Sequence, residues 1–173
     1  KSWQGRELVY VIIGSQANVA ARQNFSADMK ALADPRKTTK AQADAIIARL
    51  PGSTWLAHGV HGDEISSSDA ALMEAYHLLA ARGDAGVDAV LRESIVVIDP
   101  LQNPDGRERY ISWFRRTRGT IVNPSPDAME HYEPWPGGRF NHYLIDMNRD
   151  WTWMSQRETQ ARVAKYREWN PQV

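Results

Sequence analysis

Four stretches of the chain have the apolar patterning of β-strands. Residues 7–14 are β-branched and aromatic and end at a glycine, and residues 53–57 form a short apolar run. Residues 94–99 are apolar without interruption, which is typical of a central strand buried on both faces. Residues 144–151 predict a further short strand that ends in polar side chains.

Helical periodicity separates these predicted strands. Residues 15–32, 39–50, 65–81 and 155–169 carry apolar side chains at helical spacing, with capping or breaking residues at their ends. Strands that alternate with helices indicate an α/β fold. We therefore expect a mixed, largely parallel β-sheet sandwiched between helices.

Two later stretches interrupt this alternation. Residues 107–118 hold five arginines, which indicate either a solvated helix face or a site for an anion such as a carboxylate. Residues 120–143 are rich in proline, glycine and aromatic side chains. Because long loops inside compact domains are often functional, this loop is a candidate part of a site.

Composition narrows the possible functions. The chain has 173 residues, 42% of them hydrophobic, and a formal net charge of +0, which fits one globular domain and argues against a nucleic-acid partner. No apolar run reaches the roughly 18 residues that a membrane span requires. The absence of cysteine excludes disulfides, cysteine-ligated zinc and a thiol nucleophile.

The stretch from His58 to Glu64 is the strongest candidate for chemistry. It follows a predicted strand and precedes a predicted helix, and Gly62 allows a tight turn between His61 and Glu64. An imidazole nitrogen and a carboxylate three residues apart can bind one ion of the zinc type. Asp63 is expected to orient the His61 ring from outside the metal site. The alternative is an ordinary helix N-terminus with two acidic residues.

Three motifs occur in one order along the chain. They are His61-x-x-Glu64, then Asn103-Pro-Asp-Gly followed by Arg115-x-x-Arg118, and finally Asp-Met-Asn148-Arg149. In this combination the chain resembles the zinc metallocarboxypeptidases, the carboxypeptidase A-like peptidases, from about Gly5 onward.

The resemblance implies a role for each motif residue. His61 and Glu64 would bind Zn²⁺, and Arg118 would polarise the scissile carbonyl as the catalytic cation. Arg115, Asn148 and Arg149 would bind substrate, the last two through the C-terminal carboxylate of a peptide. We expect Arg118, Asn148 and Arg149 to converge on the cleft that holds His61.

The resemblance is incomplete, because the third zinc ligand and the general base of the family have no match in this sequence. His131 and His142 lie in the long loop and fit poorly as ligands. We therefore expect residues 1–173 to be the N-terminal portion of a single truncated catalytic domain. The isolated chain should be inactive as a peptidase, since catalytic zinc requires three protein ligands.

Two other functions stay open at this point. One is zinc-dependent deacylation of N-acyl amino acids, as in aspartoacylase and succinylglutamate desuccinylase, which resemble this chain in two of the motifs. The other is a non-catalytic binding module or fragment. The expected partner is a peptide with a free C-terminus, in a protein secreted or exported to the periplasm by a signal peptide outside this chain.

Overall fold

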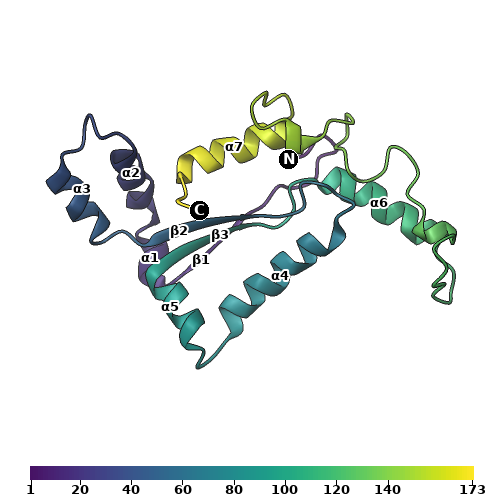
Figure 1. Cartoon of the computed structure of the whole chain (residues 1–173), viewed down its shortest axis with the longest axis horizontal. Helices are drawn as coiled ribbons and strands as arrows, with labels where there is room; N and C mark the ends of the chain where they lie inside the picture. Colours follow the sequence, from purple (N-terminus) through teal and green to yellow (C-terminus); the bar gives the residue numbers. More distant parts are fainter. The chain divides into compact units, whose positions relative to one another are not determined.

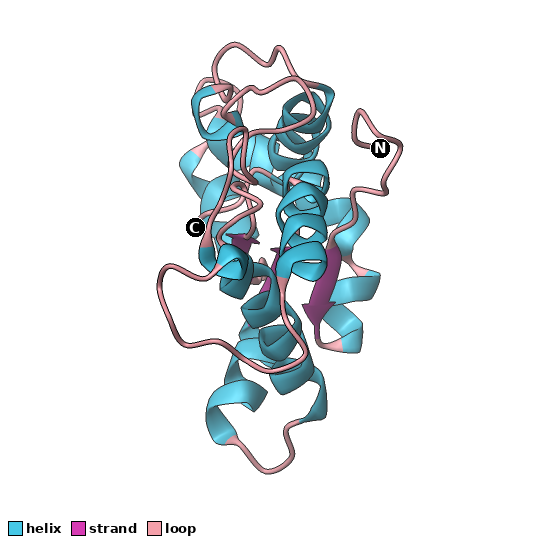
Figure 2. Ribbon diagram, turned by 90° about the vertical axis from the view of Figure 1, so that its right-hand side faces the viewer, coloured by secondary structure: helices cyan, strands magenta, loops and turns pink.

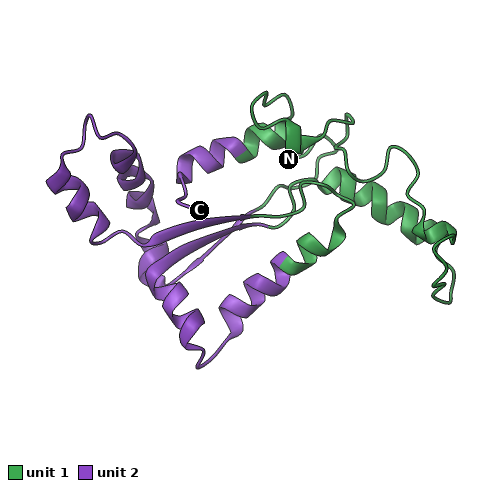
Figure 3. Cartoon of the chain, viewed as in Figure 1, with its two compact units in different colours: residues 1–9, 57–70, 100–162 green, residues 10–56, 71–99, 163–173 purple.

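The computed structural model describes all residues, Lys1–Val173. Contacts between Cα atoms divide the chain into two compact units, coloured separately in Figure 3. Unit 1 comprises residues 1–9, 57–70 and 100–162, and unit 2 comprises residues 10–56, 71–99 and 163–173.

Unit 2 contains a small sheet with strand order β1-β3-β2 (Figure 1). The strands are β1 (Val11–Gly14), β2 (Gly52–Ala57) and β3 (Ser94–Asp99). β1 runs antiparallel to β3, with Val11 opposite Ile98, so the sheet is mixed. On the β2 edge, the Trp55 N–H donates to the Val173 carbonyl, and the Val173 N–H donates to Ser53.

Strand β3 is buried on both faces, as its uninterrupted apolar pattern predicts. Ile95 and Val97 pack into one cluster, and Val96 and Ile98 pack into another. The first cluster also contains Phe25, Met29, Trp55 and Trp169. The second cluster also contains Ile13, Ala71, Ala75, Leu78 and Leu91. Helical residues therefore cover each face of this sheet.

Several helices begin where the sequence places a capping residue. Thr39 and Gln42 form a reciprocal capping box at the start of α3, so the two groups satisfy otherwise unpaired N–H donors. Asp84 accepts two N–H bonds at the start of α5. Unit 2 contains these helices: α1 (Gln16–Ala20), α2 (Arg22–Ala33), α3 (Lys40–Ile47) and α5 (Ala85–Glu93).

Unit 1, green in Figure 3, has long stretches without helix or strand, and Figure 2 draws the loops and turns of the chain in pink. It contains α6 (Pro104–Thr117) and two short 3₁₀ turns, η1 (Met129–His131) and η2 (Met147–Arg149). Helices α4 (Ile65–Ala80) and α7 (Arg157–Trp169) begin in unit 1 and end in unit 2. No helix combines the length and the apolar composition that a membrane span requires.

The expected α/β class and the mixed character of the sheet are confirmed, whereas a largely parallel sheet is not shown. Three strands are present, and one of the two pairings is antiparallel. The strand expected over residues 144–151 was wrong, because η2 occupies that stretch. There Asn141 Oδ1 accepts the Ile145 N–H and Asp146 Oδ1 accepts the Asn148 N–H, so side chains take donors that a strand ladder would use.

The structure also differs from two local predictions, one for a helix and one for a turn. The helix expected over residues 15–32 is broken at Ala21, which separates α1 from α2. The Asn103-Pro-Asp-Gly stretch was interpreted as a turn, but it forms the start of α6. Asn103 is the N-cap, and Pro104 occupies the first helical turn, where its missing N–H costs nothing.

Candidate functional site

Three chain segments of unit 1 meet through their backbones at glycines. Gly62 donates its N–H to the carbonyl of Gly138 at 2.9 Å. A Cβ atom on Gly62 would lie 2.0 Å from the backbone nitrogen of Arg107. A Cβ atom on Gly106 would lie 2.2 Å from the carbonyl oxygen of Gly138. Only glycine permits this approach, which brings together the turn after β2, the start of α6 and the long loop.

The start of α6 is fixed by buried polar bonds. The Asn103 side chain accepts the Gly106 N–H at 2.9 Å and donates to the carbonyl of Arg139 at 3.0 Å. Asp105 is buried and accepts bonds from the Ser2 hydroxyl at 2.7 Å and from Arg6 at 2.8 Å. The first turn of α6 is therefore a rigid support for the segments that contact it.

Helix α6 also fixes the long loop over residues 120–143, through Arg109. Arg109 donates to the carbonyls of Gly137, Phe140 and Asn141 at 2.8–3.2 Å. Burial lowers the pKa of this guanidinium, and the charge of Asp105 offsets part of that effect. Three bonds from one cation set the backbone path of residues 137–141, and with it the position of Arg139.

His61 lies between two carboxylates. Its Nδ1 is 3.0 Å from Glu64 Oε1, and its Nε2 is 3.1 Å from Asp146 Oδ1. The His61 side chain is 6% exposed, whereas that of Glu64 is 60% exposed. The spacing of His61 and Glu64 therefore places one nitrogen and one oxygen donor side by side, open to solvent on the Glu64 side.

Asp146 orients the ring of His61, a role that the sequence interpretation gave to Asp63. The structure corrects that interpretation, because Asp63 Oδ1 is buried without a hydrogen-bond partner. Burial alone would raise the pKa of Asp146. Hydrogen bonds from Arg139 and His61 outweigh burial and hold the pKa below its ordinary value, so the carboxylate stays ionised.

Arg139 belongs to the site, although no sequence motif identified it. Its Nε and Nη2 lie 3.1 and 2.8 Å from Asp146 Oδ2, and its Nη1 lies 3.4 Å from His61 Nδ1. The Asn148 N–H donates to Asp146 Oδ1 at 2.9 Å. Arg139 is seven residues before its partner in a loop without regular structure, so no periodicity could have indicated the contact.

Asn148 and Arg149 lie beside this cluster. Met147 is buried and anchors η2, while Asn148 and Arg149 on the same turn are exposed. The guanidinium of Arg149 donates to the Asn148 carbonyl at 3.2 Å. The turn thus presents an amide and a cation to solvent next to Asp146.

Arg115 and Arg118 lie at the other end of α6. Residues 106–118 span twelve helical steps, so Arg118 lies about 18 Å along α6 from Gly106 at 1.5 Å per residue. The Arg118 guanidinium lies 6.0 Å from the centre of the Phe114 ring. It lines a hollow of about 570 Å³ whose wall includes Val122, Glu130 and His131. The convergence of Arg118 with His61 stays a prediction.

The structure supplies two donors of the zinc type and no third. No group of three or more histidine or acidic side chains is placed to hold a metal ion. His131 Nε2 lies 3.7 Å from Glu130 Oε1, and His142 Nδ1 lies 2.9 Å from Gln4 Nε2. His58 Nδ1 lies 3.4 Å from the Ser67 hydroxyl. Zn²⁺ binding stays a prediction for His61 and Glu64.

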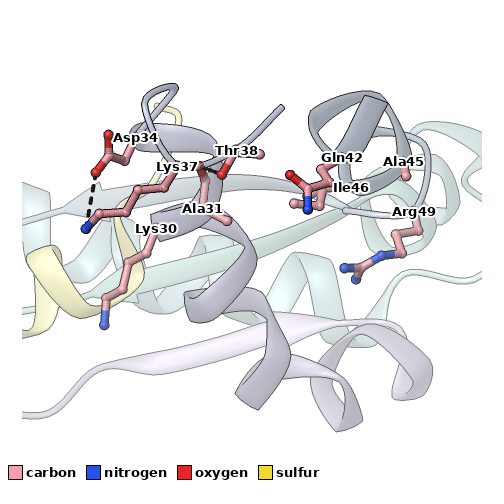
Figure 4. Close-up of a pocket in the computed structure, with 9 residues that line it drawn as sticks. All are labelled: Lys30, Ala31, Asp34, Lys37, Thr38, Gln42, Ala45, Ile46 and Arg49. Carbon is pink, nitrogen blue, oxygen red and sulfur yellow. Dashed lines mark hydrogen bonds and ion pairs between the residues drawn. The ribbon is translucent and has the colours of Figure 1, made fainter. Parts of the chain in front are cut away.

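A larger hollow occurs in unit 2, away from the motif residues. It has a volume of about 650 Å³ and lies between α2 and α3 (Figure 4). Lys37 on its wall pairs with Asp34, and Arg49 pairs with Asp28. Because these cations have acidic partners and no histidine lines the hollow, its size alone does not indicate an active site.

Comparison with known proteins assigns the chain at the level of the family. A family model described as zinc carboxypeptidase matches residues 1–172. No match is found among curated proteins. The matched region includes all the motif residues described above.

Gly62→Ala is expected to lower the free energy of unfolding by about 1–3 kcal/mol, since the new Cβ would overlap the backbone of α6. Gly119→Ala in the same unit is the control, because its nearest atom would be 3.4 Å away. Denaturant titration of both variants of the full-length protein measures the effect. Equal stability of the two variants would contradict the close backbone contact.

Asp150→Asn is expected to flatten the acid side of the stability curve. Burial raises the pKa of Asp150, but bonds from Ser155 and Gln156 outweigh it and lower the pKa overall. The unfolded chain then binds the proton more tightly, so stability present above about pH 4 is lost as the pH falls through the folded pKa. Unfolding free energies from pH 6 to pH 2 measure this loss.

The control for this pH experiment is Asp127→Asn, an exposed position. Its curve should keep the slope of the unmodified protein. An Asp150→Asn curve as steep as that of the unmodified protein would show that this carboxylate does not link folding to protons.

Proposed function

This chain belongs to the zinc carboxypeptidase family, and we propose that it forms part of a catalytic domain that removes the C-terminal residue of peptides. The observation that carries the proposal is the pairing of His61 Nδ1 with Glu64 Oε1 at 3.0 Å, with Nε2 of the ring held by Asp146. A buried histidine whose second nitrogen bonds a carboxylate is the usual arrangement at zinc sites.

The donor chemistry fits part of a zinc site. His61 supplies a ring nitrogen and Glu64 a carboxylate oxygen, both of which zinc accepts. When bound, zinc would lower the pKa of its water to about 7 and polarise a carbonyl. Two donors are fewer than the three of a catalytic site. The proposal therefore assigns this chain part of the site, as one portion of a single catalytic domain.

Asn148 and Arg149 are proposed to bind the free C-terminal carboxylate of the substrate. Both are exposed on η2, beside Asp146, and together offer an amide and a guanidinium to one anion. Hydrogen bonds to charged groups contribute about 1.5–3 kcal/mol each. Such contacts would restrict cleavage to the chain end.

Arg118 is proposed to polarise the scissile carbonyl, with Arg115 as a further substrate contact. The support for this role is the motif, since both residues lie at the far end of α6. The role requires Arg118 to lie near the carbonyl of a bound peptide. Distances between labels at the exposed positions 66 and 120, which leave Glu64 and Arg118 unchanged, with and without a peptide, would test that approach.

Zinc-dependent deacylation is the rival function, and the same site residues would serve it. The two activities differ in substrate, so N-acyl amino acids and peptides of several residues should be compared with one preparation. We propose peptides as the substrate and, for the full-length protein, secretion or export to the periplasm.

The first functional prediction concerns His61. The full-length protein should release C-terminal residues from peptides in a reaction that a chelator stops and zinc restores. His61→Ala should lose bound zinc and reduce turnover at least 10²-fold, since the metal, rather than the fold, is removed. Zinc content and peptide hydrolysis are the two measurements.

His77→Ala is the matched control for this experiment, because His77 lies in the last turn of α4 and is exposed. It should keep both zinc and activity. Turnover that survives chelation, or His61→Ala with full zinc content, would reject the metal assignment.

The second functional prediction concerns Arg149. Arg149→Ala should raise KM for free-ended peptides about 10-fold or more, because one charge-assisted bond to the carboxylate is lost. Peptides with an amidated C-terminus should be affected little. Steady-state kinetics on matched free and amidated peptides measure the difference, and equal losses on both would remove Arg149 from this role.

A further inference from the structure

We infer that Gln156 is a positioning residue that holds both ends of the 145–150 segment, the stretch of chain that presents Asn148 and Arg149 to solvent. The inference about substrate rests on the function proposed for Asn148 and Arg149, whereas the inference about the segment does not. None of the three sequence motifs contains Gln156, and only 7% of the residue is exposed.

The 145–150 segment has few local bonds of its own. It contains η2, in which the Arg149 N–H donates to the Asp146 carbonyl at 2.9 Å. The side chain of Asp146 is bonded and Met147 is buried, so the middle of the segment is held. Asn148 and Arg149 follow on the exposed side. Their position therefore depends on how the two ends of the segment are anchored.

The first end is anchored through Asn141, whose side chain is fully buried. Asn141 Oδ1 accepts the Ile145 N–H at 3.1 Å, and the Asn141 N–H donates to the Ile145 carbonyl at 3.1 Å. Asn141 Nδ2 in turn donates to Gln156 Oε1 at 2.7 Å. The indole N–H of Trp3 donates to the same oxygen at 3.1 Å. Gln156 Oε1 thus uses both of its lone pairs, and one of them fixes Asn141.

The second end is anchored through the buried carboxylate of Asp150. Its Oδ2 accepts the Gln156 N–H at 2.9 Å. Its Oδ1 accepts the N–H and the hydroxyl of Ser155, at 2.9 and 2.6 Å. Gln156 Nε2 donates to that hydroxyl oxygen at 3.0 Å, which fixes the hydroxyl that binds Asp150. Gln156 therefore holds this end through its backbone and its side chain.

Gln156 is itself fixed at the start of α7, because its carbonyl accepts the Gln160 N–H at 2.9 Å. Its side-chain oxygen accepts two bonds and its side-chain nitrogen donates one. An ionised glutamate of the same length lacks the donor, and methionine lacks both groups. One buried amide thus ties both ends of an exposed segment to a helix.

A fixed segment favours the binding of a carboxylate by Asn148 and Arg149. Chain that must be ordered on binding lowers the affinity, and preorganisation removes that cost. Loss of the Gln156 amide would loosen the segment ends without altering the groups that touch the substrate. The effect should therefore appear in substrate binding rather than in the bond-breaking step.

The kinetic test is Gln156→Met in the full-length protein, a change that keeps the length of the side chain and removes its hydrogen bonds. KM for free-ended peptides should rise about 3–10-fold, the cost of ordering one more flexible group on binding. The kcat for these peptides, and both constants for amidated peptides, should change little. Equal losses on both kinds of peptide, or no loss in a folded variant, would reject the role in substrate binding.

A second comparison shows whether Gln156 acts through the segment. In a protein that already carries Asn148→Ala and Arg149→Ala, Gln156→Met should add little to the KM for free-ended peptides, since the groups that it positions are gone. A further rise as large as in the unmodified background would show that Gln156 acts by another route.

Hydrogen exchange tests the segment without any substrate. In the unmodified protein the amides of residues 145–150 should exchange about 10-fold or more slowly than in an unstructured chain, and Gln156→Met should remove most of that protection. If Gln156→Met does not fold, the unmodified protein decides, because exchange as fast as in an unstructured chain would overturn the inference.

Gln160→Met is the matched control. Gln160 lies on the same helix and is exposed, and its side chain donates to the Met154 carbonyl at 2.8 Å, outside the 145–150 segment. The substitution should leave KM and the exchange of residues 145–150 unchanged. Loss of protection in this variant as large as in Gln156→Met would show that the segment depends on the helix as a whole.

Failure of the proposed function gives a different result. If the unmodified protein does not distinguish free-ended from amidated peptides, the carboxylate role of Asn148 and Arg149 fails. The exchange rates of residues 145–150 in the unmodified protein and in Gln156→Met still test whether Gln156 positions the segment.

Discussion

The close backbone approach at Gly62, Gly106 and Gly138 is the constraint on which the candidate site depends. It places the turn that holds His61 against the first turn of α6 and against the loop that holds Arg139. Side-chain bonds from Asn103 and Arg109 then fix that loop. The polar cluster around His61 is possible because backbone atoms, rather than flexible side chains, set the distances between its segments.

The sequence predicted the local half of this site and missed the distant half. His61 and Glu64 are three residues apart, so one turn decides whether their donors can meet. Asp146 and Arg139 reach His61 from 85 and 78 residues away, and those contacts depend on how the loop packs. Motif spacing carries no information about that packing, which is why the sequence pointed to Asp63, the nearest carboxylate in sequence, and the structure shows Asp146 in its place.

The strands show the same contrast between what the sequence pattern predicts and what it misses. The strand at residues 94–99 was predicted with its observed bounds, because burial on both faces leaves an uninterrupted apolar pattern. The strand expected over residues 144–151 failed because its polar side chains bond the backbone locally and Leu144 adopts a φ of 62°. Apolar content indicated a strand there, but the hydrogen bonds of Asn141 and Asp146 decided the conformation.

The two proposed metal donors are held very differently, and this difference determines what the rest of the site must do. His61 is buried and bonded at Nε2, so its ring is fixed before any ion arrives. Glu64 is exposed, and its side chain contacts His61 itself. An ion would therefore meet one fixed donor and one that must still be ordered. Side-chain ordering costs free energy, so affinity depends on keeping the fixed donor in its binding form. One acidic residue, Asp146, and one cationic residue, Arg139, contact the two nitrogens of this ring.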